Sequence, residues 1–269
     1  MNFDNSPLLR RVVQVASDLS RKPIANLRIL DLACAHGTYS LEFAMQGAQV
    51  LGIEGRESWL ETAARGKADT SLSNVEFVKD DVRNLSKEEY GEFDGVLCLG
   101  ILYHLDAPDV FEFLQRVAEV CRNFAIIETH FSLVAEAEHE WRGHRYWGRS
   151  VEEHPEHATE NEKLKATWAS LVNQRSFWLT QASLCNVLRH VGFTSVFDCR
   201  NPIGNMYLDG KFQIWEDRIT LAAVKGRPVH LGMSPGRTAE SEADWPEQLA
   251  EHYFQPEADF ITKLVESEE

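Results

Sequence analysis

Three signatures of other protein classes are missing from this sequence of 269 residues. It has no apolar run long enough to span a membrane, and its first residues, MNFDNSPLLRR, lack the apolar core of a signal peptide. Its five cysteines are scattered and form no CxxC pair, which argues against a disulfide framework and a structural zinc site. We therefore expect a cytoplasmic protein with reduced cysteines.

Positive charge is also scarce. Lys and Arg number 27 against 42 Asp and Glu, which gives a net charge of −15. Because affinity for a phosphate backbone rests on clustered Lys and Arg, this balance argues against a nucleic-acid partner, although it leaves a local basic patch open. The other proportions, 43% hydrophobic and 26% charged, are those of an ordinary globular enzyme.

Strand-like and helical segments alternate through the first half of the chain. Apolar runs predict strands at 27–32, 49–54, 75–79, 95–99 and 124–128. Helical spacing occurs before the first strand and between most of the others, at 6–20, 39–46, 59–67 and 110–122. This alternation predicts an α/β protein with right-handed crossovers and a buried parallel sheet, covered by helices on both faces.

After the fifth strand the alternation stops. Residues 132–179 are rich in His, Glu, Arg and Trp and show no clear strand, so we expect a mostly helical insertion that acts as a lid or acceptor pocket. A helix is predicted over 180–193, with Thr180 as its N-cap and Gly192 as its stop.

Two further strands close the predicted domain, at 194–200 and 217–226. Beyond them the chain is rich in acidic residues and contains several prolines. We therefore expect one domain over 1–225, which includes the insertion at 132–179, and an acidic extension over 226–269.

The stretch LRILDLACAHGTYSLEFA, from Leu27 to Ala44, passes from an apolar strand through a turn of small residues into a helix. The turn lies at the carboxyl end of its strand, where open α/β sheets bind ligands. Asp31 ends the strand, and Gly37 lets the backbone approach a ligand closely. A tight turn with only a packing role is the alternative.

Carboxylates end the next two strands as well. Glu54, in GIEG, can accept both hydroxyls of a ribose, a device that nicotinamide enzymes also use. Asp81, in VKDDVRNL, can accept from an adenine amino group while the next backbone N–H, of Val82, reaches a ring nitrogen. Asp81 alone fits a solvated loop acid, but in register with Asp31 and Glu54 it favours a bound nucleoside.

Together, DLACAHG, GIEGR, VKDDVRNL and FDGVLCLGILYHL resemble the class I S-adenosylmethionine-dependent methyltransferases in order and spacing. The LYH signature is similar to the subgroup that includes the tRNA wobble-uridine carboxymethyltransferases. The resemblance implies a Rossmann-like, seven-stranded sheet whose last strand is antiparallel, with S-adenosylmethionine as cofactor. The residues that it implies for cofactor binding are Asp31, Ala33, Cys34, Gly37, Glu54, Gly55, Asp81, Val82, Leu99 and Gly100.

Two positions depart from the pattern of that family, which usually has glycine where this chain has Ala33 and Ala35. Alanine is acceptable if φ is negative at both positions and only the backbone contacts the cofactor, so we expect binding to be retained. A nicotinamide cofactor fits less well, because no GxGxxG frame can be laid over LACAHGT.

Methyl transfer from a sulfonium requires the protein mainly to align an acceptor and exclude water, and a hydroxyl acceptor also needs a base. His104, just after the fourth strand, is the first candidate, with a structural bond to backbone or to Asp106 as the alternative. Tyr103, Glu128 and His130 lie on the same rim and are the next candidates, each with a structural role as its alternative.

The insertion contains HEWRGHRYWGRSVEEHPEH. Its histidines lack the paired spacing on a helix that a zinc site needs, so we predict no metal. Its aromatic and arginine side chains suit a flat or sugar-like acceptor with an anionic group, or else form the core and surface of a lid. The candidates for acceptor binding are Arg145, Tyr146, Trp147, Arg175, Trp178 and Tyr207.

These features predict a methyltransferase for a small polar metabolite, with oxygen as the first choice of acceptor atom. A tRNA-modifying enzyme is one alternative. The other alternative is a non-catalytic, methyltransferase-like module that binds a partner protein or a second copy. A homodimer is compatible with the methyltransferase as well.

Overall fold

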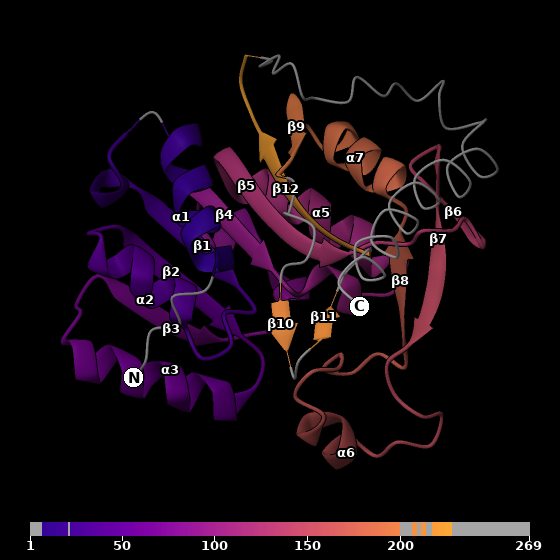
Figure 1. Ribbon diagram of the computed structural model, residues 1–269, viewed down its shortest axis with the longest axis horizontal. Coiled ribbons are helices and arrows are strands. Elements are labelled where there is room, and N and C mark those ends of the chain that lie inside the picture. Colours follow the sequence, from indigo (N-terminus) through magenta and orange to yellow (C-terminus); the bar gives the residue numbers. More distant parts are fainter. Residues whose placement is uncertain (1–6, 21, 200–205, 209–210, 214–216, 228–269) are drawn as a thin grey trace, which may run out of the picture.

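A computed structural model describes residues 7–20, 22–199, 206–208, 211–213 and 217–227. Its centre is a seven-stranded sheet in the order β3-β2-β1-β4-β5-β12-β9 (Figure 1). The five parallel strands are β1 (Arg28–Leu32), β2 (Gln49–Glu54), β3 (Val75–Lys79), β4 (Phe93–Leu99) and β5 (Cys121–His130). Strand β12 (Arg218–Val224) runs antiparallel to β5 and to β9 (Ser195–Asp198). The predicted Rossmann-like sheet with an antiparallel last strand is confirmed.

Helices cover both faces of this sheet. They are α1 (Pro7–Leu19), α2 (Thr38–Met45), α3 (Glu57–Thr70), α4 (Lys87–Tyr90), α5 (Asp109–Val120) and α7 (Gln181–His190), with 3-10 turns at Ile24–Asn26, Val82–Asn84 and Leu102–His104. Successive strand residues enter different cores: Leu97 packs with α1 and α2, whereas Val96 and Cys98 pack with α5 and α7. Burial on both faces explains why these strands are continuous apolar runs.

Local signals set the ends of α7 as predicted. The Thr180 hydroxyl accepts a hydrogen bond from the Ser183 backbone N–H at the start of the helix. Gly192, just beyond its end, has a φ of 110°, a conformation that glycine adopts without strain.

The insertion after β5 lies where it was predicted, but the prediction that it is mostly helical was wrong. It forms a three-stranded antiparallel sheet of β6 (Ala137–Trp141), β7 (His144–Glu152) and β8 (Arg175–Leu179), and α6 (Glu160–Lys165) is its short helix (Figure 1). Exposed charged residues interrupt β6 and β7, because much of this small sheet faces solvent. Its turn signal is Arg142-Gly143, where both residues have positive φ, as a two-residue hairpin requires.

Strands β10 (Met206–Leu208) and β11 (Lys211–Gln213) form a hairpin, and the side chain of Tyr207, a predicted acceptor contact, lies outside the described residues. So does most of the predicted acidic extension, from residue 228 onward. No helix within the described ranges is long and apolar enough to cross a membrane.

Candidate functional site

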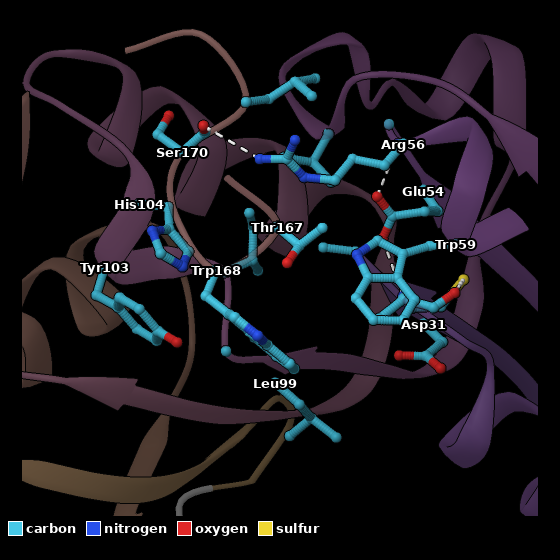
Figure 2. A pocket seen from close by; sticks show the side chains of 18 of the residues that line it. Asp31, Glu54, Arg56, Trp59, Leu99, Tyr103, His104, Thr167, Trp168 and Ser170 are labelled. Atoms are coloured by element: carbon cyan, nitrogen blue, oxygen red, sulfur yellow. Dashed lines mark hydrogen bonds between the residues drawn. The ribbon is translucent and has the colours of Figure 1, made fainter. Parts of the chain in front are cut away.

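A cavity of about 380 Å³ lies along the carboxyl ends of β1, β2, β3 and β4. It is lined by nine of the ten residues predicted to bind a cofactor, namely Asp31, Ala33, Cys34, Glu54, Gly55, Asp81, Val82, Leu99 and Gly100. Asp31 and Glu54 lie on one side of the cavity, Tyr103 and His104 lie on the opposite side, and Trp168 lies between them (Figure 2). One strand end after another therefore supplies this site, as the order of motifs predicted.

Gly37, the tenth predicted residue, supports the loop from behind. It has a φ of 77°, and a Cβ there would lie 2.8 Å from Cζ of Phe77. Its N–H donates to the Cys34 carbonyl at 2.8 Å. Gly37 is therefore needed for the shape of the turn rather than for the wall of the cavity.

The expectation of negative φ at the two unusual alanines was wrong. Ala33 has a φ of 52° and Ala35 a φ of 48°, both in the left-handed region. The loop is held there by hydrogen bonds from Cys34 N to the Ile53 carbonyl at 3.0 Å and from Ala35 N to Glu54 Oε2 at 2.9 Å. A left-handed residue with a Cβ costs roughly 1–2 kcal/mol, so this turn stores strain at the edge of the cavity.

Replacing Ala33 or Ala35 by glycine is expected to raise the free energy of unfolding by about 0.5–1 kcal/mol, since relief of the left-handed strain exceeds the entropy that glycine loses on folding. Urea unfolding measures the change. Ala64→Gly, at an exposed position on α3, is the matched control and should cost about 1 kcal/mol. Equal losses in all three variants would show that the two loop alanines are not strained.

Asp31 is a buried carboxylate with an unusual titration. Its side chain is 2% exposed, and the Ser40 hydroxyl donates to Oδ2 at 2.6 Å. Burial raises the pKa of Asp31 to about 7, and the hydrogen bond from Ser40 offsets this only in part. A cationic ligand group next to Asp31 would favour the charged form.

Glu54 is fixed by the backbone on two sides. Its side chain is buried, and it accepts hydrogen bonds from Ala35 N at 2.9 Å and from Arg56 N at 2.8 Å. These bonds use one acceptor position on each oxygen and leave further lone pairs toward the cavity. The carboxylate therefore ties the loop after β1 to the loop after β2 and can still accept from a ligand.

Asp81 is more engaged than the sequence indicated. Nη2 and Nε of Arg83 lie 2.6 Å and 3.0 Å from its two oxygens, and Arg83 N donates to Oδ1 at 2.9 Å. Burial raises the pKa of Asp81, but the hydrogen bonds from Arg83 outweigh it and the net shift is downward. Asp81 is therefore ionised, and an adenine amino group would share this carboxylate with Arg83.

His104 has a partner that the sequence did not reveal. Its Nδ1 lies 2.9 Å from Oε2 and 3.1 Å from Oε1 of Glu153, whose side chain is 6% exposed. Asp106, the partner considered from the sequence, instead accepts from the Ala107 N–H. His104 lines the cavity, and Glu153 contacts His104 from outside the lining.

The other three candidates for catalysis differ in position. Tyr103 and Glu128 line the cavity, but Glu128 accepts two hydrogen bonds from the Arg218 guanidinium, one of them from Nη2 at 2.9 Å. His130 lies behind Tyr103, with its Nδ1 3.1 Å from an Asp217 carboxylate oxygen. The Glu128 carboxylate is thus paired with the Arg218 guanidinium, and His130 is not part of the cavity lining.

Tyr146, predicted to bind an acceptor, is a core residue. It is completely buried, and its hydroxyl lies 2.6 Å from Nδ1 of His190. Trp178 supports the site from outside: its indole N–H donates to the Tyr103 carbonyl at 2.9 Å, and its ring stacks on His130. Both belong to the packing around the cavity rather than to its wall.

The other predicted acceptor contacts lie on the outer part of the insertion. Arg145 is 62% exposed and lies 3.6 Å from a Glu138 oxygen. Arg175 donates to the Ser150 hydroxyl at 2.8 Å, and Trp147 lies beside Arg145. Among the described residues, the cavity lining includes no side chain from this predicted acceptor set.

The segment 167–173 of the insertion forms part of the cavity wall. The insertion was predicted to be a lid or acceptor pocket, but none of these residues was named as a candidate. Trp168 is 79% exposed, 5.9 Å from the Trp59 ring, which in turn lies 5.6 Å from His36. Three aromatic rings therefore form a row at the cavity, one from each of three separate segments. A tryptophan-containing loop among Ser, Asn and Thr residues is too common a pattern to have identified this wall.

Arg56 holds this segment in place. Its buried guanidinium donates to backbone carbonyls of the insertion, with Leu164 O and Ala169 O at 2.8 Å and Ala166 O at 3.1 Å (Figure 2 shows its bond to Ser170). Burial lowers the pKa of Arg56, and Glu54 opposes that shift. One side chain therefore links the insertion to the cavity.

A known protein family matches the part of the chain that contains the strand ends of this site. Residues 29–123 match the family model described as a methyltransferase domain. The match covers about a third of the chain. It includes every strand end from β1 to β4 and the His104 turn, whereas the insertion and β12 lie outside the match.

Curated relatives match about a third of this chain. A 23S rRNA (uracil(1939)-C(5))-methyltransferase of Shewanella sediminis is 41% identical over 96 residues, 35% of this chain and 21% of that protein. A ubiquinone biosynthesis O-methyltransferase of Acinetobacter baylyi is 31% identical over 85 residues, 32% of this chain and 36% of that protein. The match thus spans only about a fifth to a third of the length of these relatives.

Solved structures extend the likeness beyond the methyltransferase domain. The N-terminal domain of EvdMO1, crystallised in the presence of SAH and D-fucose, is 24% identical with a TM-score of 0.64, covering 83% of this chain and 84% of that one. Magnesium protoporphyrin IX methyltransferase from Synechocystis PCC 6803, with bound SAM, is 16% identical with a TM-score of 0.51, covering 81% and 78%. At these identities the likeness shows a shared fold.

Proposed function

We propose that the protein is an S-adenosylmethionine-dependent methyltransferase that acts on a small polar acceptor, with oxygen as the methylated atom. The observation that carries this proposal is the row of Asp31, Glu54 and Asp81, which line one cavity from three adjacent strand ends. Each carboxylate matches a different part of the cofactor, and the order along the sheet agrees with the motif order. The methyltransferase domain at 29–123 supports the same reaction class.

The residues present fit the cofactor. Buried Asp31 suits the ammonium of the methionine end, Glu54 has acceptor positions left for ribose hydroxyls, and Asp81 with Val82 suits adenine. The SAM- or SAH-bound neighbours of the same fold support this assignment. When bound, the cofactor would supply an electrophilic methyl group, with its thioether as the leaving group.

The chain itself supplies proton removal and exclusion of water. His104 is placed to remove the proton from the hydroxyl group of the acceptor. Its Nε2 would receive that proton, because its Nδ1 is engaged by Glu153. Removal of this proton would make the acceptor oxygen a stronger nucleophile. The segment 167–173, held by Arg56, covers this side of the cavity and limits its access to water.

A small acceptor is favoured over a nucleic acid. The net charge of −15 disfavours a phosphate-backbone partner. Relatives named as O-methyltransferases and a neighbour crystallised with D-fucose are consistent with a small oxygen acceptor. The match to the rRNA methyltransferase covers only 35% of this chain and 21% of that protein, so it gives no weight to an RNA acceptor.

Calorimetry with S-adenosylhomocysteine tests the proposal. Binding is expected, and Glu54→Gln should weaken it about 10- to 100-fold, because charge-assisted hydrogen bonds to ribose are lost. Glu57→Gln is the matched control, since the Glu57 side chain is 63% exposed and pairs with Lys79. Absence of binding to the wild type, or equal affinities in wild type and Glu54→Gln, would contradict the assignment.

The raised pKa of Asp31, about 7, makes binding depend on pH. As the pH rises from about 4 through 7, ionising Asp31 destabilises the ligand-free protein, whereas a ligand ammonium favours the ionised form. Affinity for S-adenosylhomocysteine should therefore increase about tenfold from pH 6 to pH 8. Asp31→Asn should bind weakly with little dependence on pH; a flat wild-type profile would exclude contact between Asp31 and the ammonium.

A further inference from the structure

A carboxylate from the insertion contacts His104, a residue of the cavity wall. Glu153 follows β7 directly, in the run VEEHPEH, and its neighbour Glu152 is exposed. The Glu153 side chain is 6% exposed and lies within 2.9 Å of His104 Nδ1. Two adjacent glutamates thus differ completely in environment, and only one of them faces the methyltransferase domain.

Glu153 is itself held firmly. Its Oε2 accepts the Ser170 N–H at 2.7 Å as well as facing His104. Burial raises the pKa of Glu153, but the bonds from His104 and Ser170 outweigh it, so the carboxylate is ionised. An ionised carboxylate accepts hydrogen bonds and donates none, so the proton between the two groups lies on Nδ1 of His104.

The other ring nitrogen then carries the lone pair. Within the described part of the chain, no hydrogen bond occupies Nε2 of His104. Figure 2 shows the imidazole at the edge of the cavity, on the same side as the Tyr103 ring. A carboxylate that bonds one imidazole nitrogen selects the tautomer and orientation in which the other acts as a base.

We propose that Glu153 is a positioning residue, which holds His104 in the Nδ1–H tautomer and aims a basic Nε2 at the acceptor. The role of the base rests on the proposed function, whereas the tautomer does not. Glu153 also joins the base to the lid: Ser170, which donates to Glu153, has its carbonyl 3.2 Å from the Arg56 guanidinium. The orienting carboxylate is therefore in place when the insertion lies over the cavity.

Nitrogen-15 NMR of the imidazole side chains tests the tautomer directly in the ligand-free full chain. The wild type should show His104 as the Nδ1–H form, and Glu153→Gln should convert a large share to the Nε2–H form, because an amide N–H can donate to Nδ1. Glu152→Gln, the same change at an exposed position, should leave the spectrum unchanged. An Nε2–H wild type, or an unchanged tautomer in Glu153→Gln, would overturn the proposal.

Turnover of S-adenosylmethionine with an acceptor found by screening gives the second readout. Glu153→Gln should lower kcat about 100- to 1,000-fold with KM within threefold, and Glu153→Asp should recover part of the loss. A fall in kcat equal to that of Glu152→Gln would overturn the role. If the wild type fails to bind S-adenosylhomocysteine, the proposed function fails while the NMR result on Glu153 still stands, so the two failures are distinguishable.

Discussion

His104→Ala is expected to lower kcat for methyl transfer to a hydroxyl by about 100- to 10,000-fold, the range that a positioned general base contributes. The loss follows from geometry, since His104 lines the cavity and has one nitrogen committed to Glu153. The affinity for S-adenosylhomocysteine should stay within threefold of the wild type, because Asp31 and Glu54 lie on the opposite side of the cavity (Figure 2).

The comparison of kcat with ligand affinity separates loss of a base from loss of the site. His157→Gln, at an exposed position of the insertion, is the matched control and should change neither value. If His104→Ala retains more than half of wild-type kcat on a hydroxyl acceptor, the histidine has a structural role only. A parallel fall of affinity and kcat would likewise assign it to the cavity wall and not to proton transfer.

Arg56→Ala is expected to release the insertion segment from the cavity. The guanidinium donates to carbonyls from Lys163 to Ser170, and each bond involves a charged donor in a buried place. Loss of these bonds should raise amide hydrogen exchange over 160–173 about 100-fold, equivalent to about 3 kcal/mol of local stability. The central sheet should keep its protection, since neither of its two apolar cores includes a residue of 160–173.

Mass-spectrometric hydrogen exchange measures this effect peptide by peptide. Arg65→Ala is the matched control, because Arg65 lies exposed on α3 and donates only to the neighbouring Thr62 hydroxyl among the bonds of the described chain. If amide exchange over 160–173 is the same in Arg56→Ala as in the wild type, other contacts hold the insertion. Arg56→Lys should give an intermediate result, since an ammonium has fewer donors and no planar fork.

Continuous apolar runs made the strands of the sheet predictable. Leu97, Val96 and Cys98 are apolar because both faces of β4 are covered, and a continuous apolar run of that length is the signature of such a strand. The carboxylates Asp31 and Glu54 were predictable from their positions: Glu54 is the last residue of β2 and Asp31 the last but one of β1, and parallel strands bring their carboxyl ends to one edge.

The insertion could not be read in the same way. Its strands are partly solvent-exposed, so β6 and β7 carry charges where a buried strand would carry apolar residues. Turn chemistry at Arg142-Gly143 was the one local signal, and the positive φ at Arg142 is unusual for that residue type. A helical interpretation of 132–179 followed from composition and was wrong.

The contacts that complete the site are long-range. Arg56 bonds to carbonyls more than 100 positions along the chain, and Glu153 reaches His104 across a separation of 49 residues. Nothing in the local sequence of either residue marks its partner. The left-handed Ala33 and Ala35 pose a related difficulty, because strain that the surrounding loop maintains leaves no trace in residue type.

A crystal structure with S-adenosylhomocysteine tests the central claim most directly. Nucleoside density is expected against Glu54 and Asp81, with the ammonium group against Asp31. The sulfur is expected within reach of a small acceptor that contacts His104 Nε2. A cavity that stays empty at saturating ligand, with the Ala33 or Ala35 methyl groups occupying the cofactor position, would contradict it and favour a non-catalytic module.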